Sequence, residues 1–459
     1  MPHKLRTRSA FVLRLAAVLL LGVAMAGPAE AQTGFVVEDL GALPGDASSV
    51  AWAINARGDV VGWSNGAAGT RAFLFTDAAG LTALPGLPDR PRTVARDIND
   101  AGEIVGSANA GGTDIGHAVV WSGGSIQDLG TLGTGAYSEA WGINNTGQVV
   151  GYSYTNGGGF PYHAFLYTPS VGMVDLTPES DTGYATDIND AGQVTGYKTA
   201  FGGYHAFRWQ EGSFVDLGVL PGFAHSFGLA INASGRVAGS SSSATGNSER
   251  FVRSTDGDGL QDLGGVGEHN VARGINASGD VVGAKGQSAS RAVLYTDAAG
   301  LQDLNTLIDP SLGWVLLAAN DINDAGQIAG YGFNNFTGQT HAVRLQPATA
   351  VPECSLHCLR STGIELRARV QRKSVSIKGR VTVEDENGAA ISGALVASRW
   401  TRPDGSGEDE YAWTSSNGVA AFATTGPKGT YTLAVVNIVL SLHTFDPSHS
   451  VLLETLTVR

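Results

Sequence analysis

Cysteine is almost absent from this sequence of 459 residues, in which Cys354 and Cys358 are the only two. Two thiols exclude a disulfide-rich scaffold and a four-cysteine zinc site. His357 adds one nitrogen between them, which still leaves fewer than the four ligands that zinc prefers, so we expect no metal site there. Two alternatives stay open for the pair: a local disulfide, which requires Cα atoms within about 7 Å, or two free thiols.

Long apolar runs are missing after the first 31 residues. At the start, Lys4, Arg6 and Arg8 precede an apolar stretch over 15–26, and Ala29-Glu30-Ala31 then forms a cleavage signal. We therefore expect a signal peptide over 1–31, cut between Ala31 and Gln32. The alternative is an uncleaved anchor, but its apolar core is too short to span a bilayer. The stretch 431–442 is also too short, so we expect a secreted, extracellular, periplasmic or cell-surface protein with no membrane insertion after signal cleavage.

Basic residues are scarce over 32–345, which hold 14 Lys and Arg against 30 Asp and Glu. An acidic surface repels the phosphate backbone, so we expect no nucleic-acid partner. The remaining 346–459 hold 11 residues of each sign. Charge therefore divides the chain into an acidic main region and a neutral tail, and acidity alone indicates no more than solubility or attraction of cations.

The acidic region shows no helical pattern. Instead, one sequence motif, or phrase, recurs in it seven times. It consists of an apolar stretch, Ile-Asn, two variable residues, Gly, and a short apolar run that ends in Gly. The Ile-Asn pairs begin at Ile54, Ile98, Ile143, Ile188, Ile231, Ile275 and Ile322. A spacing of 43 to 47 residues between copies indicates one supersecondary unit repeated along the chain.

Each repeat predicts four short strands, which in the first copy are 50–54, 59–63, 71–75 and 81–84. Asn55 suits the first position of the turn after the first strand, and Gly58 suits its left-handed end. The second and third strands are apolar on consecutive residues, which is typical of strands covered on both faces. Four-stranded sheets covered by neighbours of their own kind predict an all-β fold, a seven-bladed β-propeller over 32–345. The alternative, a β-solenoid, usually has a shorter period.

The two ends of the repeat region predict how the ring closes. An extra fourth-strand phrase at 35–40 precedes the first repeat, whereas the last repeat stops after its third strand at 341–345. We expect the N-terminal strand 35–40 to close the last blade as its missing fourth strand. Such closure removes an exposed sheet edge.

Three phrases of the repeat resemble those of the HAF-repeat family of bacterial extracellular proteins. The best copy combines Asp-Leu-Gly-Thr-Leu-Gly at 128–133, Ile-Asn-Asn-Thr-Gly-Gln-Val-Val-Gly at 143–151 and His-Ala-Phe-Leu-Tyr at 163–167. The resemblance covers 35–345 and implies a secreted repeat protein, without bringing any catalytic residues. The position of the histidine is filled by His117, His163, His205 and His341, and by Arg71, Arg250 and Arg291 in the other repeats.

Two interpretations of this His/Arg position are open. Seven equivalent side chains that open the third strands could form a ring of donors around a ligand. They could instead tie each blade to a neighbouring loop, and we favour this second interpretation because ligand sites usually break the symmetry of a repeat.

The tail predicts a second, smaller domain. Its short strands alternate with turns such as Glu386-Asn387-Gly388 and Asn417-Gly418, and it is similar to a bacterial immunoglobulin-like β-sandwich over 363–459. Residues 346–362 hold two prolines and both cysteines, and we interpret them as a linker.

Function is best sought in the loops between second and third strands and between fourth and first strands, because these vary between repeats. Aromatic side chains in variable loops often recognise sugars or protein surfaces, although they can also hold the loops in place. We therefore expect a non-enzymatic binding or adhesion protein that recognises a glycan or protein on this face of the propeller. The candidate ligand-binding residues are Tyr154, Phe160, Tyr162, Phe201, Tyr204, Phe223, Phe227, Trp314, Phe333 and Phe336.

The alternative function is that of a polysaccharide hydrolase or lyase, which needs convergent carboxylates. The candidates are scattered and no motif pairs them: Asp46, Asp89, Glu139, Glu179 and Glu268. Gly62-Trp63-Ser64-Asn65-Gly66 matches G-x-S-x-G but lacks the strand–turn–helix context of a nucleophile elbow, so we assign no catalytic residue.

No cofactor is expected, and calcium is the one metal for which the sequence offers a candidate. Asp256-Gly257-Asp258-Gly259 with Asp262 is similar to a calcium loop, but it lacks the full set of oxygen ligands and aligns with an ordinary turn. The acidic sets around Asp97, Asp187 and Asp321 are interpreted as turn-forming residues.

Overall fold

The protein is described from a computed structural model that covers residues 34–110, 116–156, 161–178, 182–255, 259–265, 267, 269–286, 290–348, 358–370, 374–385, 387–440, 444–445, 450–451 and 453–458. Within these ranges every helix is a short 3-10 turn, namely η1 (Leu304–Thr306) and η2 (Pro310–Leu312), so the predicted all-β class is confirmed. No helix in the described ranges is both long and apolar enough to cross a membrane. The predicted signal peptide lies outside them.

The strands of the repeat region pair as antiparallel sheets of four, in chain order. The first half contains β2 (Asp46–Ile54), β3 (Val60–Gly66), β4 (Gly69–Thr76), β5 (Gly80–Ala83); β6 (Arg92–Ile98), β7 (Ile104–Asn109), β8 (Gly116–Ser122), β9 (Ser125–Gly130); β10 (Ser138–Ile143), β11 (Val149–Tyr154), β12 (Tyr162–Thr168) and β13 (Gly172–Asp175). The second half contains β14 (Gly183–Ile188), β15 (Val194–Ala200), β16 (Gly203–Gln210), β17 (Ser213–Asp216); β18 (His225–Ile231), β19 (Val237–Ser242), β20 (Glu249–Ser254), β21 (Leu260–Gly264); β22 (Asn270–Ile275), β23 (Val281–Lys285), β24 (Arg291–Thr296) and β25 (Gly300–Asp303).

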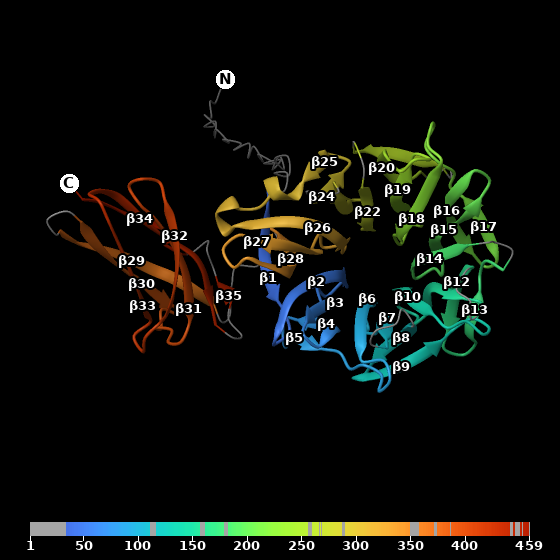
Figure 1. Cartoon of the computed structure of the whole chain (residues 1–459), viewed down its shortest axis with the longest axis horizontal. Coiled ribbons are helices and arrows are strands. Elements are labelled where there is room, and N and C mark those ends of the chain that lie inside the picture. The colour runs from blue at the N-terminus through green and yellow to red at the C-terminus, as the bar shows by residue number, and fades with distance from the viewer. Residues whose placement is uncertain are drawn as a thin grey trace, which may run out of the picture.

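The two ends of this region meet in one sheet. The last repeat supplies β26 (Trp314–Ile322), β27 (Ile328–Asn334) and β28 (Gln339–Pro347), and β1 (Phe35–Gly41) pairs antiparallel with β28 from Phe35↔Pro347 to Gly41↔Ala342. A parallel bridge, Ser48↔Thr340, continues the pairing into β2. The N-terminal strand thus lies where the sequence places it, and the sheets surround a common centre as a β-propeller does (Figure 1).

Glycine in the second strand is explained by a β-bulge in the first. In the third repeat the register of β10 against β11 shifts between Ala140 and Gly142, so Trp141 is an extra residue. A Cβ atom on Gly151 would lie 2.0 Å from the Glu139 carbonyl oxygen, so only glycine fits this approach. The same bulge recurs in β2, β6, β14, β18, β22 and β26.

The core of the repeat region lies between neighbouring sheets. A typical cluster joins Val105 and Ala118 of one sheet to Ala140, Val149 and Phe165 of the next. These side chains are buried, with at most 1% of their surface exposed. The consecutive apolar residues of the second and third strands are therefore covered on both faces, as predicted, and each sheet depends on two neighbours for its stability.

The four histidines at the His/Arg position serve the fold. The Nδ1 atom of His163 lies 2.6 Å from Asp175 Oδ2, and the other oxygen of Asp175 accepts the N–H of Thr177 at 2.9 Å. His117, His205 and His341 contact the matching Asp128, Asp216 and Asp39 in the same way. The His-Ala-Phe and Asp-Leu phrases are thus two halves of one clamp between the third and fourth strands.

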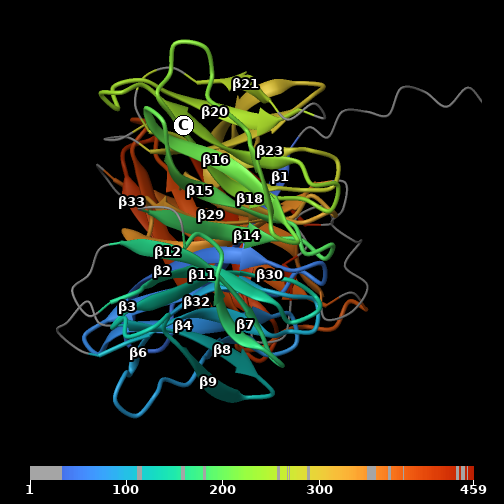
Figure 2. The ribbon, with the colours of Figure 1, turned by 90° about the vertical axis from the view of Figure 1, so that its right-hand side faces the viewer.

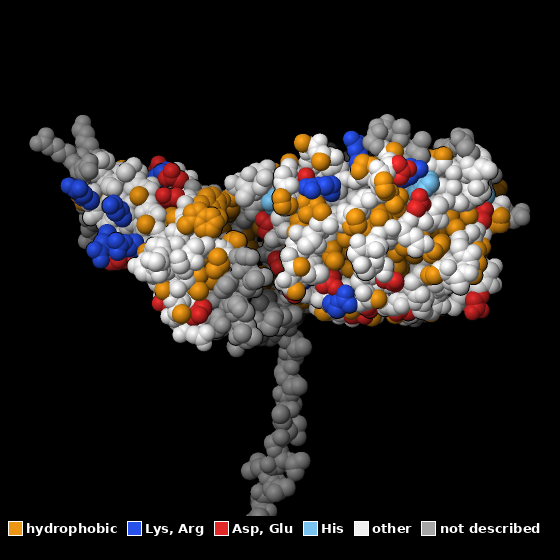
Figure 3. All heavy atoms as spheres, turned by 90° about the horizontal axis from the view of Figure 1, so that it is seen from below, with side chains coloured by type: hydrophobic (Ala, Val, Ile, Leu, Met, Phe, Trp, Pro, Cys, Tyr) orange, Lys and Arg blue, Asp and Glu red, His pale blue; other side chains and the backbone are white. Residues whose placement is uncertain are grey.

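The tail is a sandwich of two sheets. One contains β29 (Cys358–Val370), β30 (Val375–Glu384), β33 (Val419–Gly426) and β35 (Thr444–Phe445), and the other contains β31 (Leu395–Thr401), β32 (Gly407–Trp413), β34 (Gly429–Val439) and β36 (Leu453–Val458). Their shared core includes the fully buried Trp400, Tyr431 and Leu433. Figure 2 shows the tail behind the ring, and in Figure 3 basic side chains gather at the end of the tail that points away from the ring.

The predicted linker, 346–362, includes residues at both ends that belong to strands. The pairing with β1 continues β28 to Pro347, and β29 begins at Cys358 because it pairs with β30 from Arg360 onward. Cys354 lies outside the described residues and the Cys358 side chain is not described, so the disulfide stays a prediction.

Candidate functional site

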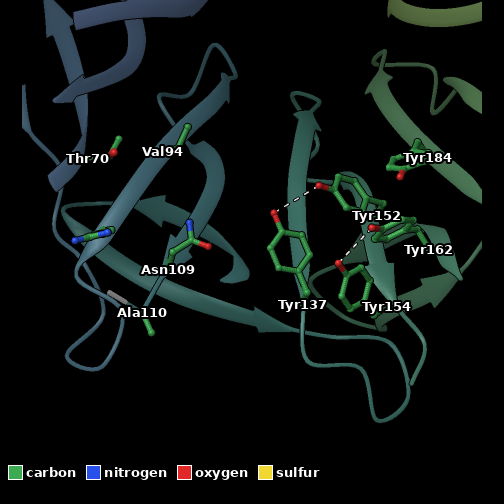
Figure 4. A pocket seen from close by; sticks show the side chains of 10 residues that line it. Thr70, Val94, Asn109, Ala110, Tyr137, Tyr152, Tyr154, Tyr162 and Tyr184 are labelled. Atoms are coloured by element: carbon green, nitrogen blue, oxygen red, sulfur yellow. Dashed lines mark hydrogen bonds between the residues drawn. The ribbon is translucent and has the colours of Figure 1, made fainter. Parts of the chain in front are cut away.

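A hollow with a volume of about 490 Å³ lies where the variable loops meet the first, second and third strands of neighbouring sheets. Figure 4 shows tyrosines along one side and smaller side chains along the other. The hollow is lined by Thr70, Arg92, Val94, Asn109, Ala110, Tyr137, Tyr152, Tyr154, Tyr162 and Tyr184. One wall, which we call the tyrosine wall, consists of aromatic rings with hydroxyl tips from Tyr137, Tyr152, Tyr154, Tyr162 and Tyr184. The opposite wall offers the guanidinium of Arg92 and the amide of Asn109.

Strand pairing explains how the tyrosines come together. Tyr152 and Tyr154 point to the same side of β11 because they are two residues apart, and Tyr162 is the partner of Tyr154 at the start of β12. The ring centroids of Tyr154 and Tyr162 are 4.7 Å apart, and their hydroxyl oxygens are 3.3 Å apart. Tyr184 of the next sheet lies 4.7 Å from Tyr152, so the wall crosses the boundary between two sheets.

The row of rings continues beyond the hollow. Tyr184 stacks on Tyr197 with 4.7 Å between centroids and an angle of 24° between the planes. Tyr197 in turn meets Phe227 at 4.9 Å, and Tyr204 lies 6.1 Å from Phe227. The aromatic surface thus extends over three successive sheets of the ring.

Glu139 lies at the base of the tyrosine wall, with 5% of its surface exposed. Its Oε2 atom accepts hydrogen bonds from the hydroxyls of Tyr137 at 3.1 Å and Tyr152 at 2.9 Å. Its Oε1 atom accepts the Nε–H of Arg96 at 2.8 Å. Both carboxylate oxygens of Glu139 therefore accept hydrogen bonds, and Glu139 orients the rings of Tyr137 and Tyr152.

The hydroxyl groups of Tyr137, Tyr152, Tyr184 and Tyr197 stay protonated. Burial, together with the negative charge of Glu139, raises the pKa of Tyr137 and of Tyr152 above its usual range. Burial and neighbouring tyrosines raise the pKa of Tyr184, and burial raises that of Tyr197 to about 12. At physiological pH these groups present hydrogen-bonding hydroxyls on apolar rings rather than charges.

The structure brings together four of the ten predicted ligand residues, namely Tyr154, Tyr162, Tyr204 and Phe227. Phe223 lies half-buried in the loop between β17 and β18, and Phe201 is fully exposed on the turn between β15 and β16. Phe160 lies outside the described residues.

The remaining three predicted residues lie on the sheet of β26, β27 and β28, in a separate place. Trp314 packs against the core cluster beneath β1, and Phe333 is paired within β27. Phe336 contacts Gly313, and the guanidinium of Arg399 in the tail lies 4.9 Å from its ring. The contacts of these three residues lie within the last sheet and at its junction with the tail. The three side chains are therefore not part of the tyrosine wall.

Four members of the aromatic row were missed by the sequence analysis: Tyr137, Tyr152, Tyr184 and Tyr197. The variable loops were expected to hold the ligand site, whereas three of these residues, Tyr152, Tyr184 and Tyr197, lie inside strands. A signal was available for Tyr152 and Tyr197, because each directly follows the glycine that ends the Val-x-Gly phrase. The residue after that glycine lies opposite a residue of the first strand, so Tyr152 is the partner of Glu139 and Tyr197 is the partner of Tyr184.

The candidate carboxylates of the hydrolase alternative do not converge among the described residues. Asp46 forms an ion pair with Arg71 at 2.9 Å, and Asp89 is exposed beside Arg90. Glu139 is occupied as described above, and Glu179 and Glu268 lie outside the described ranges. Ser64 of the G-x-S-x-G match is buried and accepts the Leu43 N–H at 3.1 Å, which is a structural role.

The acidic sets around Asp97, Asp187 and Asp321 are not merely turn-forming, which corrects the sequence analysis. Each of these carboxyls accepts one N–H of its own strand and one of the next sheet, as Asp97 does from Ile98 and Ile143 at 2.8 Å. Residues 256–258 of the calcium candidate lie outside the described ranges. In the described ranges, no group of three His, Cys, Asp or Glu side chains is placed to hold a metal ion.

No family model matches this chain, and no curated protein matches it at a significant level. Among solved structures, it is similar to TolB from Acinetobacter baumannii, with 13% identity and a TM-score of 0.35 over 56% of this chain and 61% of that one. A candidate gluconolactonase has 11% identity and a TM-score of 0.35, over 69% and 93% of the chains. Kuenenia stuttgartiensis hydrazine synthase has 10% identity and a TM-score of 0.34, over 92% and 68%.

This chain therefore spans less than two thirds of the TolB structure. Similarity at such low identity and TM-score carries no argument about function, and the assignment of the fold depends on the strand pairing.

Proposed function

We propose that this protein is a secreted, non-enzymatic binding protein that recognises a glycan in the tyrosine-lined hollow. It is a seven-bladed propeller of HAF-like repeats with an immunoglobulin-like tail. The basic and apolar start of the chain, followed by Ala29-Glu30-Ala31, supports export. The hollow is the single observation that carries the proposal.

The chemistry of the hollow suits a sugar. A sugar ring has apolar C–H faces and a rim of hydroxyls, and a tyrosine offers an apolar face and a hydroxyl tip. Five tyrosines, Arg92 and Asn109 surround a volume within the usual range for small-ligand sites, which is about 300–1,000 Å³. A protein partner usually needs a broad contact of about 800 Å² on each side, so a concave site of this size favours a glycan.

We favour recognition over hydrolysis because no carboxylate at the described hollow is placed for acid–base catalysis. Glycoside cleavage commonly uses two acidic groups on either side of the bond. Among the residues lining the described hollow there is none, and Glu139 at its base already accepts hydrogen bonds from Arg96 and two tyrosines. Such a group orients the wall and is poorly placed to transfer a proton.

A glycan array followed by calorimetry tests the proposal. The variant with Tyr154→Ala and Tyr162→Ala removes two adjacent rings of the wall, and we expect it to bind the selected glycan at least about tenfold more weakly, since aromatic contacts of this kind contribute about 1 kcal/mol or more. Phe201→Ala is the matched control, because this exposed aromatic lies outside the hollow and should leave affinity unchanged.

Three outcomes would contradict the proposal: no glycan bound at any concentration tested, equal affinity in the double variant, or turnover of a polysaccharide. The first would favour a structural spacer and the last would favour the enzyme alternative. Circular dichroism of each variant shows whether the fold is retained.

A further inference from the structure

Arg92 is the one charged side chain among the ten residues that line the described hollow. It lies at the start of β6, two residues before Val94, so both side chains point to the same face of that strand. Asn109 of β7 is the partner of Arg92 across the ladder. In Figure 4, Val94 and Asn109 lie across the hollow from the tyrosines, so this wall presents a guanidinium beside an amide.

The neighbouring sheet leaves room for the Arg92 side chain. A Cβ atom on Gly69, at the start of β4, would lie 2.8 Å from Arg92 Nε and 3.3 Å from its Cδ atom. Gly69 also has a φ of 95°, which glycine adopts without strain. The side chain of Arg92 therefore packs against this backbone, beside Thr70, which also lines the hollow.

Acidic side chains of neighbouring strands already have arginine partners of their own. Asp46 forms an ion pair with Arg71 at 2.9 Å, and Glu139 forms one with Arg96 at 2.8 Å. Both acidic side chains are buried, with 2% and 6% of their surface exposed. In the described part of the chain no carboxylate is paired with Arg92, so its positive charge is open to a ligand.

The charge of the hollow is opposite to that of the repeat region as a whole. Residues 32–345 hold 30 acidic and 14 basic residues, whereas the lining of the hollow contains one arginine and no acid. At physiological ionic strength the Debye length is about 8 Å, so exposed charges farther away than this are largely screened. Arg92 therefore determines the charge that a ligand meets inside the hollow.

We propose that the glycan of this site is acidic, with a hexuronic acid unit whose carboxylate pairs with Arg92 while its ring contacts the tyrosine wall. A planar carboxylate matches the guanidinium fork with two parallel hydrogen bonds. The tyrosine hydroxyls and the Asn109 amide can bond the neutral hydroxyls of the same sugar. This inference rests on the proposed function, to which it adds the class of sugar and the residue that selects it.

A glycan array that displays uronic-acid oligosaccharides beside neutral counterparts of the same linkage is the first test. We expect the bound glycans to carry a carboxylate. Methyl esterification of the selected glycan removes this charge and keeps the sugar ring. Calorimetry should then show binding at least about fivefold weaker for the ester than for the free acid, because charge-assisted hydrogen bonds are stronger than neutral ones. A selected glycan that is neutral, or that binds equally well as its methyl ester, would overturn the inference.

Variants of Arg92 identify the residue that reads the carboxylate. Arg92→Gln keeps a hydrogen-bond donor and removes the charge, so it should bind the free acid and the methyl ester with about equal affinity. Arg92→Glu should prefer the ester. Arg367→Gln is the matched control, because it removes one positive charge from a tail side chain that is 75% exposed, and it should keep the parent preference for the free acid. An Arg92→Gln variant with the parent preference would refute the role of Arg92.

Failure of this inference differs from failure of the proposed function. The variant with Tyr154→Ala and Tyr162→Ala should weaken binding of the free acid and of the ester by the same factor, because these rings contact the sugar ring and not its charge. Binding of neutral glycans alone would contradict the acidic sugar and leave the glycan site intact. No binding to any glycan would contradict both.

Discussion

Asn144 shows why each repeat retains asparagine after isoleucine. Its Oδ1 atom accepts the N–H groups of Thr146 at 3.1 Å and Gln148 at 3.0 Å, which closes the turn. Its Nδ2 atom donates to the Asn189 carbonyl of the next sheet at 3.1 Å. Equivalent bonds run from Asn55 to Asn99 and, at the closure, from Asn323 to Asn55. One side chain therefore shapes a turn and joins two sheets.

We expect Asn144→Ala to lower the free energy of unfolding by about 1–3 kcal/mol, since it leaves buried backbone groups without partners. In a protein of this size each kcal/mol corresponds to about 2–4 °C in melting temperature. Differential scanning calorimetry measures the shift, and Ser213→Ala, at an exposed hairpin position, is the control. An unchanged melting temperature for Asn144→Ala would show that the link between sheets contributes nothing.

Sequence reasoning at this scale captured roles within a turn and missed roles between sheets. The asparagine and glycine of the turn could be predicted because local backbone geometry requires them. The partner of Asn144 is 45 residues away, at Asn189, and no local rule reveals it. For the same reason Asp97 was assigned to a turn, although it joins two sheets.

At the scale of secondary-structure elements, β1 is the strand that closes the ring, and its removal tests whether this closure stabilises the protein. It completes the sheet of β28, and the neighbouring contacts depend on that sheet: the Ala342 N–H donates to Ser49 Oγ at 2.7 Å, and Ser49 donates to the Gly41 carbonyl at 2.5 Å. The pairing of 35–40 could be predicted by counting, because the last repeat lacks a fourth strand.

Deletion of residues 35–40 should lower the melting temperature by about 10 °C or more, because it removes a ladder of hydrogen bonds worth about 1 kcal/mol each and the buried Phe35 and Leu40 side chains. A synthetic peptide spanning 34–41 should restore part of the loss when added in excess. Thermal melts monitored by circular dichroism measure both effects. A deletion variant that melts like the full chain would argue against closure by β1.

Strand positions were predicted well because the repeat supplies seven independent copies of one pattern. The tyrosine wall was predicted only in part, because it arises where the repeats differ. Tyr137, directly before β10, and Tyr184, in β14, occupy positions at which other copies hold residues such as Arg92 and Val50. Strand propensity does not show that neighbouring sheets bring such rings together.

At the scale of the whole molecule, the repeats are not equivalent around the ring. The position two residues before the asparagine is an aspartate in three repeats and a small residue in the other four: Ala53, Asp97, Gly142, Asp187, Ala230, Gly274 and Asp321. Each acid reaches into the next sheet, where the equivalent residue is small. Glycine also precedes two of the acids around the ring. A Cβ on Gly142 would lie 2.9 Å from the Cα atom of Asp187 in the following sheet, and one on Gly274 would lie 2.8 Å from that of Asp321, so these glycines make room for the acids.

These three carboxyls make stability depend on pH. Loss of hydration raises the pKa of Asp97 to about 7 and that of Asp321 to about 6, and it also raises that of Asp187, to which the other two carboxyls add repulsion. In the unfolded chain these groups lose their protons near pH 4. Between pH 4 and 7 the folded state therefore binds more protons, and raising the pH lowers the free energy of unfolding.

We expect the melting temperature to fall by several degrees, about 2–4 °C for each kcal/mol lost, between pH 5 and pH 8. Asp187→Ala tests the cause, because alanine already occupies the equivalent position at Ala53 and Ala230. The variant loses two hydrogen bonds at every pH, but at pH 8 it also escapes the cost of a charged carboxylate inside the ring. Its deficit relative to the parent protein should therefore be smaller at pH 8 than at pH 5. Calorimetric melts of both proteins across this range measure the difference, and parallel curves would mean that the titrating groups lie elsewhere.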